Sequence, residues 1–220
     1  MSFEFMADLD EYFCEKYANY DMLCGLEGYK LPKMQNSEVR DGRTFAYTLP
    51  PETMRLALQE QKTELLQVLK KTLVDKTFSF SFYPLKWRAR LSNRFGVFGF
   101  VKVFNDILLK KRISALTIAD GLTVDSVIFK KVCKGKFLPT KNLIFSIALA
   151  GEFSKEETTK LLESCGEKWE FVHARDTVVS YLLERGVYST ALIRLALDEY
   201  KIENLFLSFD EAENTEISEK

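Results

Sequence analysis

Apolar residues recur at helical spacing along most of this chain, and glycine, proline and polar clusters separate the repeats. The pattern predicts a first helix over residues 8–24 and a long helix that Pro50-Pro51 opens. Residues 29–49 between them are loop-like, with RTFAYTL as a possible short strand. The next segment, TFSFSFYP, alternates phenylalanine with serine, which is the period of a strand. We place a domain boundary near Pro84.

From residue 100 to residue 166 the pattern predicts five short helices. The first three lie in FVKVFNDILLKKR, SALTIADGL and TVDSVIFKKVCKG, the third with Thr123 as its N-cap. The fourth, TKNLIFSIALAG, follows Pro139 and is almost wholly apolar, so it must be central. SKEE at residues 154–157 is a capping box that begins the fifth. Three residues of the third helix can face inward: Val127, Ile128 and Val132.

Two further helices are predicted before the chain ends in an acidic segment. The last of them is expected to bury four apolar residues: Leu192, Ile193, Leu195 and Leu197. The sequence therefore predicts a mainly α-helical protein. Its expected parts are an N-terminal helical region (1–83), a basic arm with the five-helix domain (84–166), a two-helix extension (167–207) and an acidic disordered tail (208–220).

The net charge of −1 conceals a division of charge along the chain. Residues 84–138 carry 12 Lys and Arg against 3 Asp and Glu, whereas residues 1–83 carry 10 against 13 and residues 139–220 carry 9 against 16. Such a basic block is a candidate footprint for a polyanion. The alternative is that the basic block docks on the acidic ends of the same chain.

The layout of residues 100–166 resembles the phage-repressor-like helix-turn-helix domain. In this layout the second helix covers 114–120, a tight turn lies at Gly121-Leu122, and the third helix covers 124–133. The run CKGKFLPTKNLIFSIALA, with Gly and then Pro after the third helix, is also similar to that family. The segment from ESCGEKW to IRLALDEY resembles a C-terminal helical extension of such domains in uncharacterised bacterial proteins.

The resemblance implies that the third helix enters the major groove of duplex DNA. Four of its residues would lie nearest to bases: Asp125, Ser126, Phe129 and Lys130. Four lysines would contact the phosphate backbone: Lys131, Lys134, Lys136 and Lys141. Apart from the resemblance, the arm LKWRARLSNRFG surrounds Trp87 with Lys86, Arg88, Arg90 and Arg94. Cations interleaved with aromatics suit phosphate contact and base stacking, although an amphipathic linker would have the same pattern.

The sequence contains no motif that indicates an enzyme, a metal site or a cofactor. His173 is the only histidine, and we expect it to lie at the surface or at a helix cap. Four scattered cysteines are expected to be reduced thiols: Cys14, Cys24, Cys133 and Cys165. The acidic N-terminus does not fit a secretory signal, and no apolar stretch could span a bilayer, so we expect a cytoplasmic protein without a membrane partner.

Two functions of different classes remain open from the sequence. The first is a nucleic-acid-binding regulatory protein that acts on duplex DNA as a homodimer. The second is a protein-interaction module, for example an inhibitor or accessory subunit in a bacterial or phage defence system, with no nucleic-acid binding of its own. The Val, Ile and Phe residues of the third helix and the acidic ends of the chain favour the second. This second function predicts that the third helix is covered or exposes an apolar patch.

Overall fold

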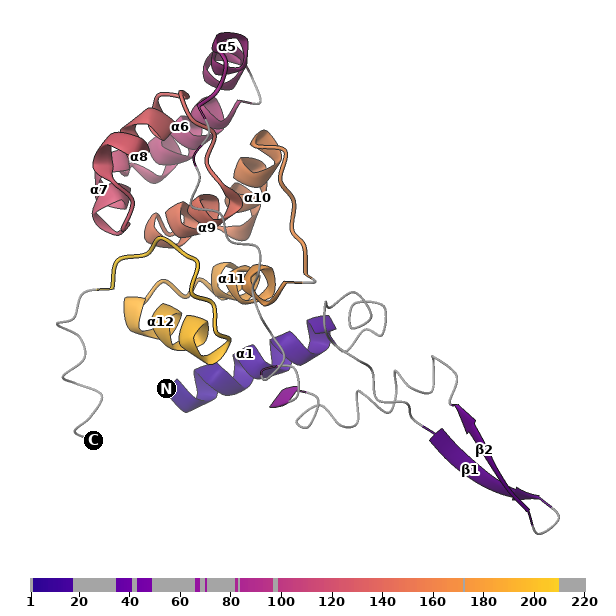
Figure 1. Ribbon diagram of the computed structural model, residues 1–220. Helices are drawn as coiled ribbons and strands as arrows, with labels where there is room; N and C mark the ends of the chain where they lie inside the picture. The colour runs from indigo at the N-terminus through magenta and orange to yellow at the C-terminus, as the bar shows by residue number, and fades with distance from the viewer. Residues whose placement is uncertain are drawn as a thin grey trace.

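The chain folds into a stack of helices that runs from α5 at one end of the molecule to α1 near the other (Figure 1). The computed structural model describes residues 2–17, 35–40, 43–48, 66–67, 70, 82, 84–96, 99–171 and 173–209. Its helices are α1 (Ser2–Tyr17), α5 (Trp87–Phe95), α6 (Phe100–Lys111), α7 (Ala115–Asp120), α8 (Ser126–Cys133), α9 (Lys141–Ala150), α10 (Lys155–Ser164), α11 (Ala174–Arg185) and α12 (Thr190–Glu199).

The mainly α-helical class predicted from the sequence is confirmed. The described strands, β1 (Gln35–Arg40) and β2 (Arg43–Thr48), form an antiparallel hairpin. Strand β2 coincides with the predicted strand RTFAYTL, but β1 lies in the segment predicted to be a loop. Asp41-Gly42 between them is a common two-residue hairpin sequence that could have indicated the partner strand. Most of the predicted long helix and of TFSFSFYP lies outside the described residues.

Helix α9 is the centre of the fold, as its apolar sequence predicts. Every residue from 141 to 149 is buried, and α10 packs against both α9 and α6. A helix with apolar residues on all sides is stable only where neighbours cover all of them. The core continues from α9 into α11, whose residues 174–183 are also buried.

Short polar side chains cap four of the five helices in the predicted five-helix segment, whereas α6 begins after Gly99 without a side-chain cap. Ser114, Asp125 and Thr140 each accept a backbone N–H at the start of α7, α8 and α9. The predicted capping box at the start of α10 is confirmed, with Ser154 and Glu157 bonding reciprocally. Thr123 is not the cap of α8, since Asp125 takes that role and the helix begins two residues later than a Thr123 cap requires.

Helix α1 packs on α11 and α12, far away in the sequence. The Tyr181 hydroxyl donates to the Asp8 carboxylate at 2.9 Å, and the Tyr200 hydroxyl donates to Asp10 at 2.8 Å. The helix begins at Ser2, so the predicted start at residue 8 is wrong, and residues 18–24 of that prediction lie outside the described part. The N-terminal helix is therefore held by the same helices that were predicted as a C-terminal extension.

The segment after α12 returns to the turn between α7 and α8. Thr123 N donates to Phe206 O at 3.0 Å, Ser208 N donates to Gly121 O at 2.9 Å, and Leu122 and Leu207 form an isolated β-bridge. The predicted disordered tail is thus wrong at its first residue, because Ser208 is bonded; residues 210–220 lie outside the described part. On α12 the prediction is wrong for Leu195, which is exposed, and Leu192 is only half-buried.

The structure also bears on the question of a membrane. Within the described ranges, none of the helices combines the length and the apolar character that crossing a bilayer requires.

Candidate nucleic-acid interface

Helix α8, predicted to enter the major groove, is set by the cap at its first turn. The Asp125 carboxylate accepts from Val127 N at 2.9 Å and from Ile128 N at 3.1 Å. A carboxylate is favourable there because it faces the positive end of the helix dipole. The same carboxylate would repel a phosphate at this end of the helix, and one of its two oxygens, Oδ1, accepts both capping bonds. Asp125 therefore caps α8, and its contact with a base stays a prediction.

The buried face of α8 differs from the predicted one, as if the helix were turned slightly about its own axis. Phe129 and Val132 are buried in the core, whereas Ser126 and Lys130 are exposed. The prediction that Phe129 lies near bases is wrong, because its ring supplies core volume between α8 and its neighbours. Val127, predicted to face inward, is 54 % exposed. Of the four expected base-reading residues, only Ser126 and Lys130 have an exposed side chain that neither caps the helix nor packs in the core.

Lys141 does not lie at the surface with the other predicted phosphate contacts. It is buried in the first turn of α9, where its ammonium lies 2.6 Å from the Asp176 carboxylate and 3.1 Å from that of Glu170. A buried lysine needs such partners, because an unpaired charge in the core is costly. The prediction that Lys141 binds phosphate is therefore wrong, and the residue joins α9 to α11.

Helix α5 carries three cations of the basic arm and the fourth, Lys86, is its N-cap. All four are exposed: Lys86, Arg88, Arg90 and Arg94. The helix is attached to the body of the protein by the side on which Asn93 lies. Asn93 is its only buried residue, and the Asn93 side-chain oxygen accepts from Phe100 N at 3.0 Å. One donor of the Arg90 guanidinium is already used, because its Nε donates to Leu85 O at 2.6 Å.

The turn after α8 packs directly on α5. Leu85 N donates to Lys136 O at 3.0 Å, and Pro84 forms a β-bridge with Phe137. Gly135 has a φ of +69°, and a Cβ on it would lie 2.9 Å from Val101 Cγ2 and 3.6 Å from Arg94 Cβ. Only glycine suits this conformation and this approach. The contact brings Lys134 and Lys136, which flank Gly135, next to the C-terminal half of α5.

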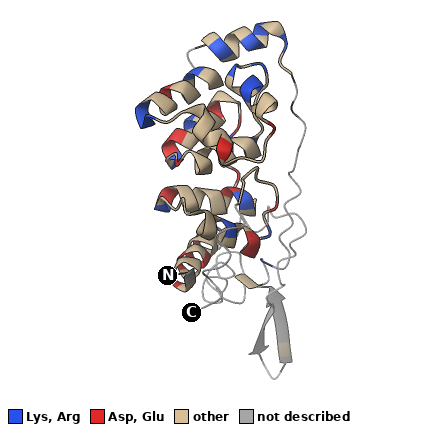
Figure 2. Cartoon of the chain, turned by 90° about the vertical axis from the view of Figure 1, so that its left-hand side faces the viewer, with Lys and Arg blue, Asp and Glu red and all other residues tan. Residues whose placement is uncertain are grey.

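We call the cations of α5 and its N-cap, of the last turn of α8 and of the turn that follows it the basic surface: Lys86, Arg88, Arg90, Arg94, Lys130, Lys131, Lys134 and Lys136. None of them forms an ion pair with another residue of the described part of the chain. Figure 2 shows Lys and Arg along α5, at the top of the view, without Asp or Glu beside them. Lys130, Lys131 and Lys134 also face the negative end of the α8 dipole, which stabilises the helix without neutralising their charge.

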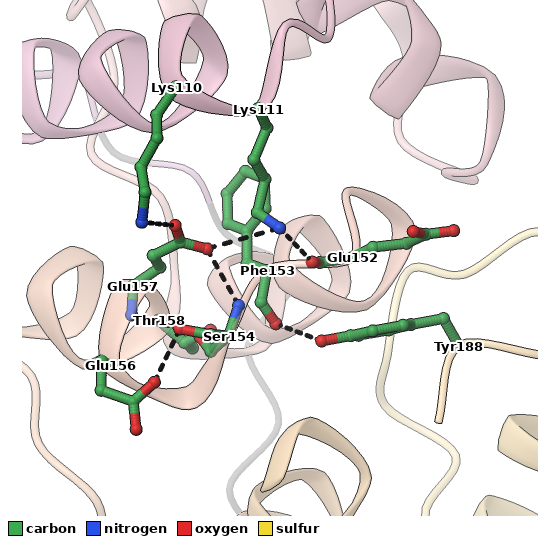
Figure 3. A network of polar contacts seen from close by, with 9 residues as sticks. All are labelled: Lys110, Lys111, Glu152, Phe153, Ser154, Glu156, Glu157, Thr158 and Tyr188. Carbon is green, nitrogen blue, oxygen red and sulfur yellow. Dashed lines mark hydrogen bonds and ion pairs between the residues drawn. The ribbon is translucent and has the colours of Figure 1, made fainter. Parts of the chain in front are cut away.

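Other cations of the basic block do dock on an acidic part of the chain. Lys110 Nζ lies 2.9 Å from one oxygen of Glu157, and Lys111 Nζ lies 3.6 Å from the other, joining α6 to the start of α10 (Figure 3). Burial raises the pKa of Glu157, but the hydrogen bonds from Lys110 and from Ser154 N outweigh it and hold the pKa below its ordinary value. The docking alternative thus applies to these two lysines and not to the basic surface.

Three features of the described residues bear on catalysis and metal binding. They contain no group of His, Cys, Asp and Glu that could hold a metal ion. Burial raises the pKa of Cys133 to about 11 and that of Cys165 to about 12, which keeps both as thiols rather than nucleophilic thiolates at neutral pH. His173 occupies the N-cap position of α11 without a capping hydrogen bond from its side chain.

Comparison of the chain with protein-family models, with curated proteins and with solved structures finds no match. The geometry of the basic surface is therefore the basis for assigning a function. Sequence reasoning found its cations but missed what joins them, the contact of Gly135 with α5. The one local signal for that contact is a glycine between two lysines directly after a helix.

Proposed function

We propose that this protein binds nucleic acid through the basic surface and acts as a regulatory protein on duplex DNA, as a homodimer. The observation that carries the proposal is the grouping of cations from α5 and from the α8–α9 turn, with no acidic partner in the described part of the chain. Cations left unpaired at a surface repel one another, and a polyanion relieves that repulsion while releasing its own counterions.

The proposed mode of binding is mainly contact with phosphates. Ser126 and Lys130 are the expected base-reading residues that remain exposed on α8, so discrimination between bases rests on few side chains. Phosphate contacts fix the position of a protein on a duplex but carry no base information. We therefore expect tight, salt-sensitive binding with a weak sequence preference.

The test compares two variants with the same loss of charge. One replaces Lys130, Lys134 and Lys136 by alanine, and the control replaces Lys160, Lys168 and Lys201, which are exposed elsewhere. Affinity for a duplex oligonucleotide is measured by fluorescence anisotropy at several salt concentrations. The first variant should reduce the slope of log affinity against log salt by about 2 to 3, since each phosphate contact contributes about 0.9. The control should keep the slope of the wild type.

A second candidate function, the protein-interaction module, is favoured by a specific observation. Large apolar side chains are exposed on three successive helices: Leu109 on α6, Leu116 on α7 and Val127 on α8. Large apolar side chains that are exposed are candidate contact sites for partners. The absence of nucleic-acid binding at low salt, in the wild type as well as in both variants, would overturn the first candidate and leave this one.

A further inference from the structure

Helix α5 carries an apolar line that no other described element covers. Trp87 is 65 % exposed, Leu91 47 % and Phe95 68 %. Residues four apart on a helix lie on the same face, so the three side chains form one row along α5. Asn93, the buried residue that attaches α5 to α6, lies on the opposite side. The row, which we call the α5 stripe, therefore points away from the body of the protein.

Each aromatic ring of the α5 stripe has a guanidinium beside it. Arg88 Cζ lies 5.6 Å from the centre of the Trp87 ring, and Arg94 Cζ lies 5.2 Å from the centre of the Phe95 ring. Cation–π contacts of this kind hold the charge close to the ring face or edge while the rest of the ring stays open. Residues 84–105 contain no Asp or Glu, so the charge around the stripe is wholly positive.

This chemistry restricts what can cover the stripe. An apolar groove of a protein partner would have to bury two guanidinium groups with the rings, which is costly without matching carboxylates. A strand of nucleic acid supplies a base for each ring and a phosphate for each guanidinium. The rings start eight residues apart, about 12 Å along the helix, which corresponds to three or four nucleotides of a stacked strand. Bases in a duplex are already stacked on both sides, so the stripe suits unpaired bases.

We propose that the α5 stripe is a binding site for the unpaired bases of single-stranded nucleic acid. Trp87 and Phe95 stack on bases, Leu91 contacts the strand between them, and the adjoining basic surface holds the phosphates. The inference rests on the proposed function, because the phosphates must bind first for the bases to be presented. It adds a substrate class, a single strand or a junction with unpaired bases, to the expected duplex.

The experiment measures the affinity of the full chain for a single-stranded oligothymidine and for a duplex of equal length at one salt concentration. The variants are Trp87→Ala with Phe95→Ala, the conservative pair Trp87→Phe with Phe95→Tyr, and the control Leu109→Ala, whose side chain is 76 % exposed on α6. The alanine pair should weaken single-strand binding by roughly 25-fold or more, since the loss of one stacked base costs roughly 5- to 150-fold and the pair removes two rings. Duplex affinity, the conservative pair and the control should stay within about twofold of the wild type.

Tryptophan emission gives a direct readout of the stacking. The second tryptophan, Trp169, is packed against Phe145, with ring centres 5.1 Å apart. Oligothymidine should quench the tryptophan emission of the wild type but not that of Trp87→Phe. The difference in quenching between the two proteins then comes from Trp87. Quenching of equal size in both proteins would overturn the inference.

The remaining outcomes separate this inference from the proposed function. Unchanged single-strand affinity in the alanine pair overturns the stripe as a base site, while duplex binding still supports the proposed function. No binding of either nucleic acid at low salt overturns both. Vesicles of anionic and of zwitterionic lipid form a further arm: if the alanine pair loses only anionic-vesicle binding, the stripe faces a lipid surface and the inference is wrong.

Discussion

Lys141 in α9 and Asp176 in α11 form a buried ion pair, with Nζ and the carboxylate oxygen 2.6 Å apart. Asp176 also accepts from Glu170 N at 2.8 Å, so the carboxylate serves the loop before α11 as well as the lysine. The pair fixes the position of α11, and α11 in turn carries α1. A lysine that looks like part of the basic block in the sequence therefore belongs to the core.

Replacing Lys141 with methionine should destabilise the protein strongly. Methionine preserves the stem volume but removes the ammonium, and Asp176 keeps the buried Arg175 guanidinium 2.9 Å away. The loss should therefore lie below the range of about 3–5 kcal/mol that follows when a buried charge is left with no charged partner. Urea denaturation should show this loss in the free energy of unfolding. The exposed Lys160 is the control, and Lys160→Met should change stability by less than about 0.5 kcal/mol. An unfolding free energy equal to that of the wild type would mean that Lys141 is not buried.

The local parts of this fold could be predicted from the sequence because their causes are local. The capping box of Ser154 and Glu157 needs only four consecutive residues, and the burial of α9 follows from its own composition. The cap of α8 was ambiguous, since TVD offers both Thr123 and Asp125 as caps and the choice depends on where the helix packs.

The parts that could not be predicted depend on contacts between distant segments. Nothing near Lys141 distinguishes it from Lys136, yet one is buried beside Asp176 and the other is exposed. In the same way, the pairing of Leu207 with Leu122 adds a bridge to the turn that has no periodic signal in the sequence. In the candidate interface, the cations were visible in the sequence, but the contact that groups them was not.

Gly135 should be more sensitive to alanine than Gly166, although both have positive φ. The φ values are +69° and +76°, so both substitutions strain the backbone by about 1 kcal/mol or more. A Cβ on Gly135 would also lie 2.9 Å from Val101 Cγ2, whereas one on Gly166 would have nothing within 4 Å. Thermal denaturation should give a lower Tm for Gly135→Ala than for Gly166→Ala. Equal Tm values would show that Gly135, in the turn after α8, is not in close contact with Val101 of α6.

The ionised Glu157 carboxylate should make the free energy of unfolding fall as the pH is lowered into the acid range. Its pKa in the folded protein is held below the ordinary value of 4.5, so the unfolded chain binds the proton more readily. The stabilisation is present above that ordinary value and is lost as the pH falls through the lower folded pKa. Urea denaturation at a series of pH values should therefore show wild type more stable than Glu157→Gln at pH 7, with the difference shrinking in acid.

The control for this pH dependence is Glu163→Gln, an exposed position on the same helix. Its free energy of unfolding at pH 7 should stay within about 0.5 kcal/mol of the wild type, because Glu163 is exposed and forms no ion pair with a described residue. A Glu157→Gln curve that stays parallel to the wild type would mean that Lys110 and Lys111 do not stabilise the Glu157 carboxylate.

Lys130 and Lys136 should differ in what they do for nucleic-acid binding. Lys130 lies on the exposed face of α8 with Ser126, whereas Lys136 lies in the turn beyond the helix. If α8 sits in the major groove, Lys130→Ala should change the order of affinities over a set of duplex sequences, because base contacts are worth about 1–3 kcal/mol each. Lys136→Ala should weaken binding to all of them about equally, because a phosphate contact is the same at every sequence. The measurement is a competition assay over the set at fixed salt. A uniform loss in both variants would place α8 outside the groove and leave a protein that holds nucleic acid by its phosphates alone.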